Sequence, residues 1–252
     1  DSGFAIDIEK LRASITEKTT MLVYNNYQNP ICAASSQEEV EALAELALEH
    51  DLWVLSDDAY YEIRYTDEPP RSIVNIPGMQ ERTLILYTFS KKFAMTGWRV
   101  GASIGPTEVI KHIARFNIND ESCTNHFIQH ALAETVGGDP SGANELLYEL
   151  QTRRDETIKG LNAIEGIHVP TPESTFYSYP NVTGVMAEKG FTDLDKFRTA
   201  ALESTGVSFC ARHHFGTPLA GETDHYIRLA YSGISQDDIR EGLGKLKTWI
   251  EG

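Results

Sequence analysis

The sequence YTFSKKFAMTGWRVG, residues 87–101, decides the fold and the chemistry that we predict for this chain. It follows a short apolar run at residues 83–86 that is long enough for a buried strand. A second strand-like run, residues 100–104, closes the segment. Lys91 and Arg99 therefore stand at the end of a predicted buried strand, where unpaired charge is costly. An anionic ligand that also reacts with an amine would account for both charges.

Strands and helices alternate upstream of this segment. The apolar runs at residues 20–24 and 52–55 are typical of buried strands. Between them, Ser36 and Glu39 have the spacing of a capping box and begin an amphipathic helix, and Asp7 caps an earlier helix. This alternation predicts an α/β fold with a mostly parallel sheet.

The second part of the chain predicts a different architecture. From residue 106 the apolar spacing is helical, and a long amphipathic helix follows the break at residues 137–140. We expect a large domain at residues 1–145, and a bridging helix with a smaller α+β domain at residues 146–252. The smaller domain contains predicted strands at 175–179, 207–210 and 226–231 and predicted helices near 193–204 and 236–250.

Composition excludes several classes of function. The 252 residues carry a formal net charge of −15, which disfavours nucleic acid as a partner because the phosphate backbone needs clustered positive charge. The three cysteines, Cys32, Cys123 and Cys210, are far apart and favour reduced thiols in a cytoplasmic protein over a disulfide framework. No apolar run has the length of a membrane span, and no leader opens the chain, so we expect no membrane partner.

Polar residues follow three of the predicted strands. Asn29 lies in a turn cluster after the first strand, Asp57 ends the second and Lys91 follows the third. Ligands of parallel α/β sheets bind at the carboxyl ends of the strands. We therefore expect these three residues to contribute to one site.

The lysine segment resembles that of the class I/II aminotransferases, the fold-type I enzymes that use pyridoxal phosphate (PLP). In that family the lysine of K-x-x-A-M-T-G-W-R-V-G carries the cofactor as a Schiff base, and the arginine eight residues later binds its phosphate. The resemblance implies these roles for Lys91 and Arg99, with Thr88 and Ser90 as further phosphate contacts. It covers all of this chain but only the later part of a typical family member, whose usual N-terminal portion has no counterpart here.

Asp57 and Tyr60 extend the resemblance. The segment SDDAYYE at residues 56–62 is similar to the family's S-D-E-x-Y-E segment, with Asp58 in place of the usual glutamate. The resemblance implies that the Asp57 carboxylate pairs with the pyridinium nitrogen and that Tyr60 donates to the phenolic oxygen.

Asn29 and Arg228 complete the predicted set. Asn29-Pro30 resembles the family's N-P-T-G segment, whose asparagine contacts the phenolic oxygen, but Cys32 stands where the family has glycine. Glycine tolerates a positive φ and cysteine adopts it rarely, so the loop need not have the conformation that it has in the family. Arg228 resembles the family's C-terminal arginine, which binds the substrate carboxylate through its planar guanidinium.

The resemblance implies an aminotransferase (a transaminase of amino-acid metabolism) that moves an amino group between an amino acid and a 2-keto acid. Family enzymes are usually homodimers, so we expect a homodimer. Two alternatives stay open: another fold-type I PLP enzyme such as a C–S lyase, and a catalytically silent PLP-fold domain that binds a ligand or partner.

We predict no metal site. His213 and His214 are adjacent, so on a strand their side chains would point apart, and no carboxylate completes a ligand spacing in the sequence.

Overall fold

The computed structural model describes residues 4–252 and divides into two compact units. The first unit holds the described residues up to Gln28 together with Ala33–Leu147, and the second holds Asn29–Cys32 together with Tyr148–Gly252. Each unit is described by itself.

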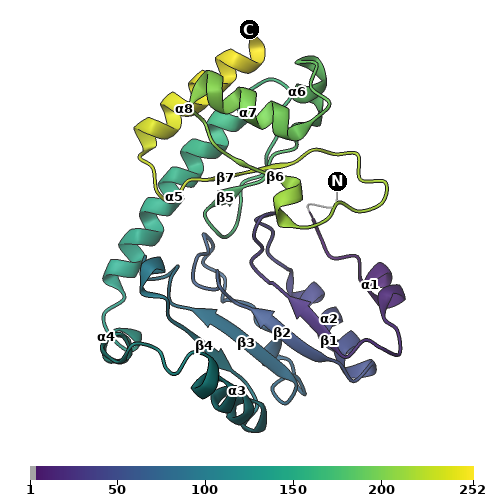
Figure 1. Ribbon diagram of the computed structural model, residues 1–252, viewed down its shortest axis with the longest axis vertical. Coiled ribbons are helices and arrows are strands. Elements are labelled where there is room, and N and C mark those ends of the chain that lie inside the picture. Colours follow the sequence, from purple (N-terminus) through teal and green to yellow (C-terminus); the bar gives the residue numbers. More distant parts are fainter. Residues whose placement is uncertain (1–3) are drawn as a thin grey trace. The chain divides into compact units, whose positions relative to one another are not determined.

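A four-stranded sheet forms the centre of the first unit, in the order β1-β2-β3-β4 (Figure 1). Its strands are β1 (Met21–Tyr24), β2 (Trp53–Asp57), β3 (Thr83–Thr88) and β4 (Gly101–Ile104). β1, β2 and β3 are parallel, whereas β4 is antiparallel to β3. The predicted mostly parallel sheet is therefore confirmed.

Two helices whose starts were predicted pack in this unit. Helix α1 (Ile8–Ser14) begins after the Asp7 cap, and α2 (Gln37–Glu49) begins with the complete Ser36–Glu39 capping box. The apolar face of α2 packs on one face of the sheet, where Val40 and Leu43 join Tyr24 and Val54 in a buried cluster. The periodicity of α2 thus builds the core that holds β1 and β2 in place.

The other face of the sheet carries exposed apolar side chains. Val23 of β1 is 72% exposed, and Leu86 of β3 is 40% exposed. Parallel sheets usually bury both faces. Within the described part of the chain, this sheet is packed mainly on its α2 side.

Three helices follow the sheet. They are α3 (Thr107–Asp120), α4 (His126–Val136) and α5 (Ser141–Asn162). α3 buries none of its residues, whereas Ile128 and Leu132 of α4 pack against Val100. The boundary between the two units falls inside α5. Among the described residues, none of the helices combines the length and the apolar content that a bilayer crossing needs.

The second unit contains a small antiparallel sheet in the order β5-β7-β6. Its strands are β5 (Tyr177–Ser178), β6 (Cys210–Ala211) and β7 (Ile227–Ala230), and its helices are α6 (Thr183–Glu188), α7 (Leu194–Thr205) and α8 (Gln236–Glu251). The described residues also form three short 3-10 helices: η1 (Ile73–Asn75) and η2 (Thr96–Trp98) in the first unit and η3 (Arg212–Phe215) in the second.

The strands of this sheet are shorter than predicted, for local reasons. Thr175 has a φ of +66°, which breaks the extended run before β5. Gly206, with a φ of +77°, ends α7, and the Val207 amide donates to Thr205 Oγ1. The residues before β6 are therefore held in a turn rather than in a ladder.

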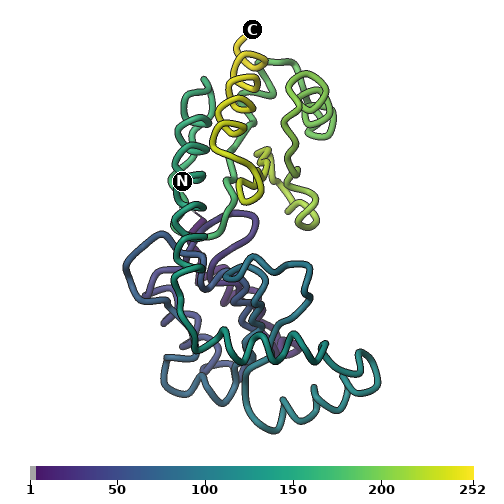
Figure 2. The backbone as a smooth tube through the Cα atoms, turned by 90° about the vertical axis from the view of Figure 1, so that its left-hand side faces the viewer, coloured from purple at the N-terminus to yellow at the C-terminus, as the bar shows by residue number. Residues whose placement is uncertain are grey.

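Helices α5 and α8 pack closely beside one another in the second unit (Figure 1, Figure 2). Gly160 of α5 makes this possible, because a Cβ there would lie 2.5 Å from Leu243 Cδ1 and 3.2 Å from Leu243 Cβ. Leu243 belongs to the main buried cluster of the unit. The missing side chain of Gly160 thus forms the notch that receives Leu243.

Replacement of Gly160 by alanine should destabilise the second unit. Overpacking costs about 1–3 kcal/mol, which outweighs the gain of about 1 kcal/mol from better helix propensity. Urea unfolding followed by circular dichroism measures the change. Gly244→Ala on α8 is the matched control, because a Cβ at Gly244 meets nothing within 4 Å, and it should stabilise the chain slightly. A Gly160→Ala variant as stable as Gly244→Ala would contradict the close packing.

Candidate active site

Lys91 lies in the turn that follows β3 in the first unit, and the residue is half-buried. Its Nζ is 5.5 Å from the centroid of the buried Tyr60 ring, within the range of a cation–π contact. The neighbouring Lys92 has a different partner, since its Nζ donates to Glu62 Oε1 at 3.0 Å. The two consecutive lysines thus have distinct environments.

Asp57 is the last residue of β2 and pairs in register with Leu86 of β3. This pairing sets the Asp57 carboxylate at the same sheet edge as the turn that carries Lys91. One carboxylate oxygen, Oδ1, accepts a hydrogen bond from the Ala59 amide at 3.1 Å. The local turn therefore fixes the carboxylate at the end of the strand.

Asp58, the next residue, has the opposite environment. It is 5% exposed, and its carboxylate accepts a hydrogen bond from Ser56 Oγ at 2.8 Å. Burial raises the pKa of the Asp58 carboxyl above its usual value, and the Ser56 hydrogen bond opposes part of that rise. Adjacent aspartates at the end of β2 are thus one half-buried and one buried.

Hydroxyl groups gather at the end of β3. Thr88 Oγ1 donates to Ser90 Oγ at 2.9 Å, and the Ser90 amide donates to Thr88 Oγ1 at 3.2 Å. Gly101 lies opposite Thr88 in the ladder, where a Cβ would come within 2.7 Å of the Tyr87 carbonyl oxygen. The second glycine of the lysine segment therefore permits the close approach of β3 and β4.

Arg99 lies between η2 and β4 in a left-handed conformation, with a φ of +54°. Its guanidinium is exposed and donates to the Thr96 carbonyl at 2.9 Å. The exposed guanidinium retains further N–H donors for an anion.

Arg228 has the most elaborate environment of the predicted residues, and it lies on β7 of the second unit. Its Nη1 donates to Asn29 Oδ1 at 2.7 Å, although the two residues are 199 positions apart. The centre of the guanidinium lies 4.2 Å from the ring centroid of Tyr177 and 4.7 Å from that of Phe215. Nη2 donates to Cys210 Sγ at 3.7 Å. The two rings and Asn29 therefore fix the orientation of the guanidinium plane.

The loop around Cys32 keeps a positive φ although it lacks glycine. Cys32 has a φ of +60° and is 7% exposed, and its thiol donates to the Pro30 carbonyl at 3.2 Å. A left-handed residue other than glycine costs of order 1 kcal/mol, which the burial of the side chain offsets. The substitution of cysteine for glycine thus leaves the loop in a conformation that favours glycine. Burial raises the pKa of the Cys32 thiol to about 12.

Comparison with known proteins identifies the family. The family model described as "Aminotransferase class I and II" matches residues 1–246. The chain belongs to the class I and II aminotransferase family. The family is one of pyridoxal phosphate enzymes, as the lysine segment predicts.

Relatives and solved structures of this family match almost the whole chain. An asparagine–oxo-acid transaminase of Streptococcus mutans is 32% identical over 253 residues, which are 100% of this chain and 62% of that protein. An aspartate aminotransferase of Musicola paradisiaca is 34% identical over 94% of this chain and 57% of its own length. The structure of the Rhizobium meliloti aspartate aminotransferase superposes with a TM-score of 0.90 at 32% identity, over 99% of this chain and 62% of that one.

The aminotransferase-family chain therefore spans about 60% of the length of these relatives. The aromatic aminotransferase of Pyrococcus horikoshii, at a TM-score of 0.90 and 29% identity, matches 99% of the chain and 64% of its own. These neighbours confirm the fold-type I architecture expected from the sequence.

The donors of the first unit fit pyridoxal phosphate. The cofactor requires a primary amine, an anion for its ring nitrogen and donors for its phosphate. The amine of Lys91, the carboxylate of Asp57 and the hydroxyls of Thr88 and Ser90 all lie at the ends of neighbouring strands. The narrow β3–β4 approach at Gly101 leaves the backbone free of a side chain beside Thr88.

The sequence did not identify the full environment of Arg228. The contacts of Tyr177 and Phe215 with the guanidinium depend on the β5-β7-β6 order, which local patterns do not reveal. The contact with Cys210 was also missed, because local patterns do not reveal the β6–β7 register that places Cys210 across from Arg228.

Contrary to the prediction from the sequence, the histidine pair does not lie on a strand, and a carboxylate lies close to it. His213 and His214 lie on the 3-10 helix η3 rather than on a strand, and Asp195 Oδ2 lies 3.1 Å from His213 Nε2. Ligand atoms of these three exposed residues lie within 4.8 Å of one another. However, His214 Nδ1 accepts a hydrogen bond from the Ala211 amide, which occupies the lone pair of that nitrogen.

The raised pKa of Asp58 predicts a pH-dependent effect of Asp58→Asn. Because the folded chain binds the proton more tightly than the unfolded chain, stability from Asp58 is present at low pH and is lost as the pH rises through the folded pKa. The variant stays neutral, so its Tm should exceed that of the native chain at pH 7. The advantage should shrink as the pH falls toward 3.8, the ordinary value. The exposed Asp67→Asn should show no such trend, and an equal trend in both variants would refute the prediction.

The cysteines should differ in reactivity at pH 8. Exposed Cys123 should react within minutes with a disulfide reagent such as DTNB, whereas Cys32 should react only in denaturant because its thiol is buried and its pKa is raised to about 12. Peptide mapping of the labelled chain distinguishes the sites. Labelling of Cys32 as fast as Cys123 in the native state would contradict its burial.

Proposed function

We propose that this chain supplies the cofactor lysine and the substrate-binding arginine of a PLP-dependent aminotransferase. Such an enzyme moves an amino group between an amino acid and a 2-keto acid. The main observation is the position of Lys91 just beyond β3, at the same sheet edge as the Asp57 carboxylate that ends the adjacent β2. Because the chain belongs to the aminotransferase family, we interpret this arrangement as the cofactor site.

The residues of the first unit would hold the cofactor. When bound, PLP supplies an aldehyde that condenses with amines and a ring that takes up electron density. Asp57 would keep the ring nitrogen protonated, Tyr60 would donate to the phenolic oxygen, and Thr88, Ser90 and Arg99 would bind the phosphate. Asn29 of the second unit is proposed as a further donor to the phenolic oxygen.

Lys91 has two proposed tasks. Its Nζ would hold the cofactor covalently in the resting enzyme. Once the substrate amine replaces it, the same Nζ would take the proton from the substrate Cα and return it at the end of the half-reaction, as general base and then general acid. The Tyr60 ring at 5.5 Å restricts where the amine can go when it is released.

Arg228 would bind the α-carboxylate of the substrate. Its guanidinium contacts the rings of Tyr177 and Phe215, and Asn29 accepts a hydrogen bond from one of its nitrogens. A planar guanidinium binds a carboxylate through two parallel hydrogen bonds, which an ammonium group does not reproduce. Orientation of Arg228 before binding reduces the entropy lost when the substrate is captured.

Several finer properties belong to this proposal. A homodimeric assembly is expected from the family resemblance, and a cytoplasmic location from the unpaired, widely spaced cysteines. Light scattering of the purified chain tests the assembly. The named relatives act on aspartate, asparagine and aromatic amino acids, so these are the first substrates to assay.

The alternatives differ in their need for an acceptor. An aminotransferase releases a keto acid in catalytic amounts only when a second keto acid is present, whereas a C–S lyase needs none. A silent binding domain produces no keto acid under either condition. The family relationship favours aminotransfer, and assays with and without 2-oxoglutarate decide between the three functions.

Lys91→Ala should abolish the visible imine absorbance that appears when PLP is added to the purified chain. Amino transfer should fall by at least about 100-fold, the usual contribution of a general acid–base group. Lys92→Ala is the matched control, since Lys92 pairs with Glu62 and should retain both signals. An unchanged spectrum in Lys91→Ala, or loss of the band in Lys92→Ala alone, would overturn the assignment.

A further inference from the structure

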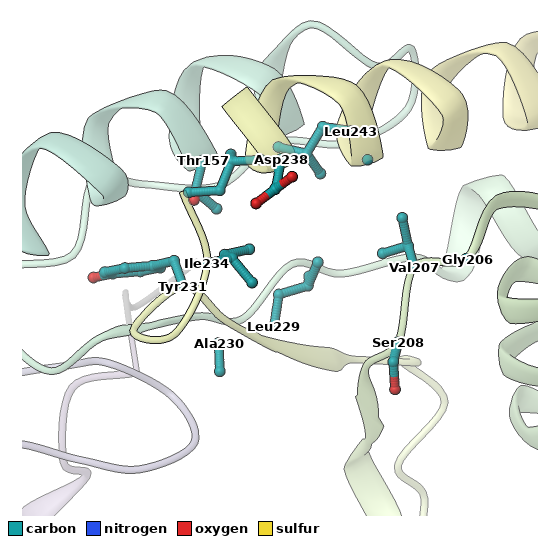
Figure 3. Close-up of a pocket in the computed structure, with 12 residues that line it drawn as sticks. Thr157, Gly206, Val207, Ser208, Leu229, Ala230, Tyr231, Ile234, Asp238 and Leu243 are labelled. Carbon is teal, nitrogen blue, oxygen red and sulfur yellow. The ribbon is translucent and has the colours of Figure 1, made fainter. Parts of the chain in front are cut away.

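A cavity of about 350 Å³ lies within the second unit, bordered by α5, α8, β7 and the turn before β6 (Figure 3). Its volume is in the range of cavities that bind small molecules. None of the residues proposed for the cofactor or the substrate carboxylate lines it. The cavity is therefore a separate feature of the unit, and it needs its own explanation.

Most of the cavity wall is apolar. Leu229 of β7, Leu243 of α8 and Val207 of the turn contribute side chains to the wall, and Figure 3 shows them around the empty centre. Leu229 and Leu243 are buried, 8% and 6% exposed. Such a wall favours an apolar body, since each buried CH₂ group contributes about 0.8 kcal/mol.

Polar side chains, among them those of Thr157, Ser208 and Asp238, interrupt this apolar wall. Thr157 of α5 is 3% exposed, and its Oγ1 has no hydrogen-bond partner among the described residues. Asp238 of α8 directs its carboxylate toward the cavity (Figure 3). One of its oxygens, Oδ2, accepts from Ser235 Oγ at 2.7 Å, which leaves most of the acceptor capacity of the carboxylate unused.

We propose that this cavity binds a small cation with an apolar body and N–H donors, such as an aryl or alkyl ammonium or amidinium ion. The Asp238 carboxylate pairs with the positive charge, and Thr157 Oγ1 accepts a further N–H. The apolar side chains surround the remainder of the ligand. The carboxylate disfavours an anion of the same shape, because like charges repel and no cationic side chain lines the cavity.

This site is distinct from the proposed substrate site. Leu229 and Ala230 of β7 line the cavity, whereas Arg228 of the same strand does not. An amino-acid carboxylate at Arg228 and a cation at Asp238 would therefore bind at different places in the unit. The inference does not depend on the proposed aminotransferase activity.

The probe for the test is the benzamidinium ion, which carries several N–H donors and forms no imine with PLP. Benzamide and benzoate have the same shape and differ in charge. Isothermal titration calorimetry should detect binding of benzamidinium, and benzamide should bind with lower affinity. Benzoate should not bind in the cavity. Any benzoate that binds at Arg228 should bind equally well to the native chain and to Asp238→Asn.

Matched variants locate the site. Asp238→Asn should weaken benzamidinium binding severalfold, because the ion pair of an exposed carboxylate is screened by water and contributes up to about 1 kcal/mol. Asp237→Asn is its control, since Asp237 is next in sequence, pairs with Arg240 and does not line the cavity. Thr157→Val removes the unpaired hydroxyl without loss of volume and should weaken binding severalfold. This variant preserves the test if Asp238→Asn fails to fold.

A filling variant provides a second, independent test. Gly242 lines the cavity, and a Cβ there would meet only Val207 Cγ2 at 3.4 Å, so Gly242→Leu should fold and occupy the space. Binding should be lost in Gly242→Leu and retained in Gly244→Leu, which extends into open solvent. Absence of benzamidinium binding to the native chain would overturn the proposal. Equal affinity in Asp238→Asn and Asp237→Asn, or binding that survives in Gly242→Leu, would overturn it as well.

Discussion

The parallel pairing of β2 with β3 is the constraint on which the proposed chemistry depends. Because both strands run the same way, their carboxyl ends meet at one edge of the sheet. That edge brings a carboxylate and a primary amine, Asp57 and Lys91, into the same neighbourhood although they are far apart in sequence. The core under this edge, where α2 packs on Tyr24 and Val54, keeps the register fixed. A slip of one residue would turn Asp57 to the other face.

In the second unit, the main feature of the proposed site is the set of contacts around the Arg228 guanidinium. Arg228 stands on a short strand between β5 and β6, and it receives neighbours from both sides. Tyr177 comes from β5, and Phe215 follows β6 on the 3-10 helix η3. Asn29 belongs to this unit although it precedes the other members of the group by more than a hundred positions. These contacts restrict the orientation of the guanidinium.

Much of this architecture could be predicted from the sequence because it depends on local patterns, namely helix caps and short apolar runs. Caps at Asp7 and Ser36, short apolar runs and the lysine segment fixed the positions of the first strands and helices. Other features depend on contacts between distant segments and were missed for that reason. The positive φ of Cys32 contradicts the preference of an isolated residue, and the burial of the side chain explains it. The short helix α6 has no amphipathic period long enough to recognise, and the histidine pair was assigned to the wrong element because turn and strand look alike there.

The notch at Gly160 has a consequence beyond the contact of two helices. Leu243, which fills the notch, also forms part of the wall of the cavity beside Asp238. The distance between α5 and α8 and the width of the cavity therefore both depend on how deeply Leu243 packs against Gly160. Replacement of the Gly160 hydrogen atom by a methyl group would therefore change the size of the ligand that the proposed site could bind. Gly160 itself does not line the cavity.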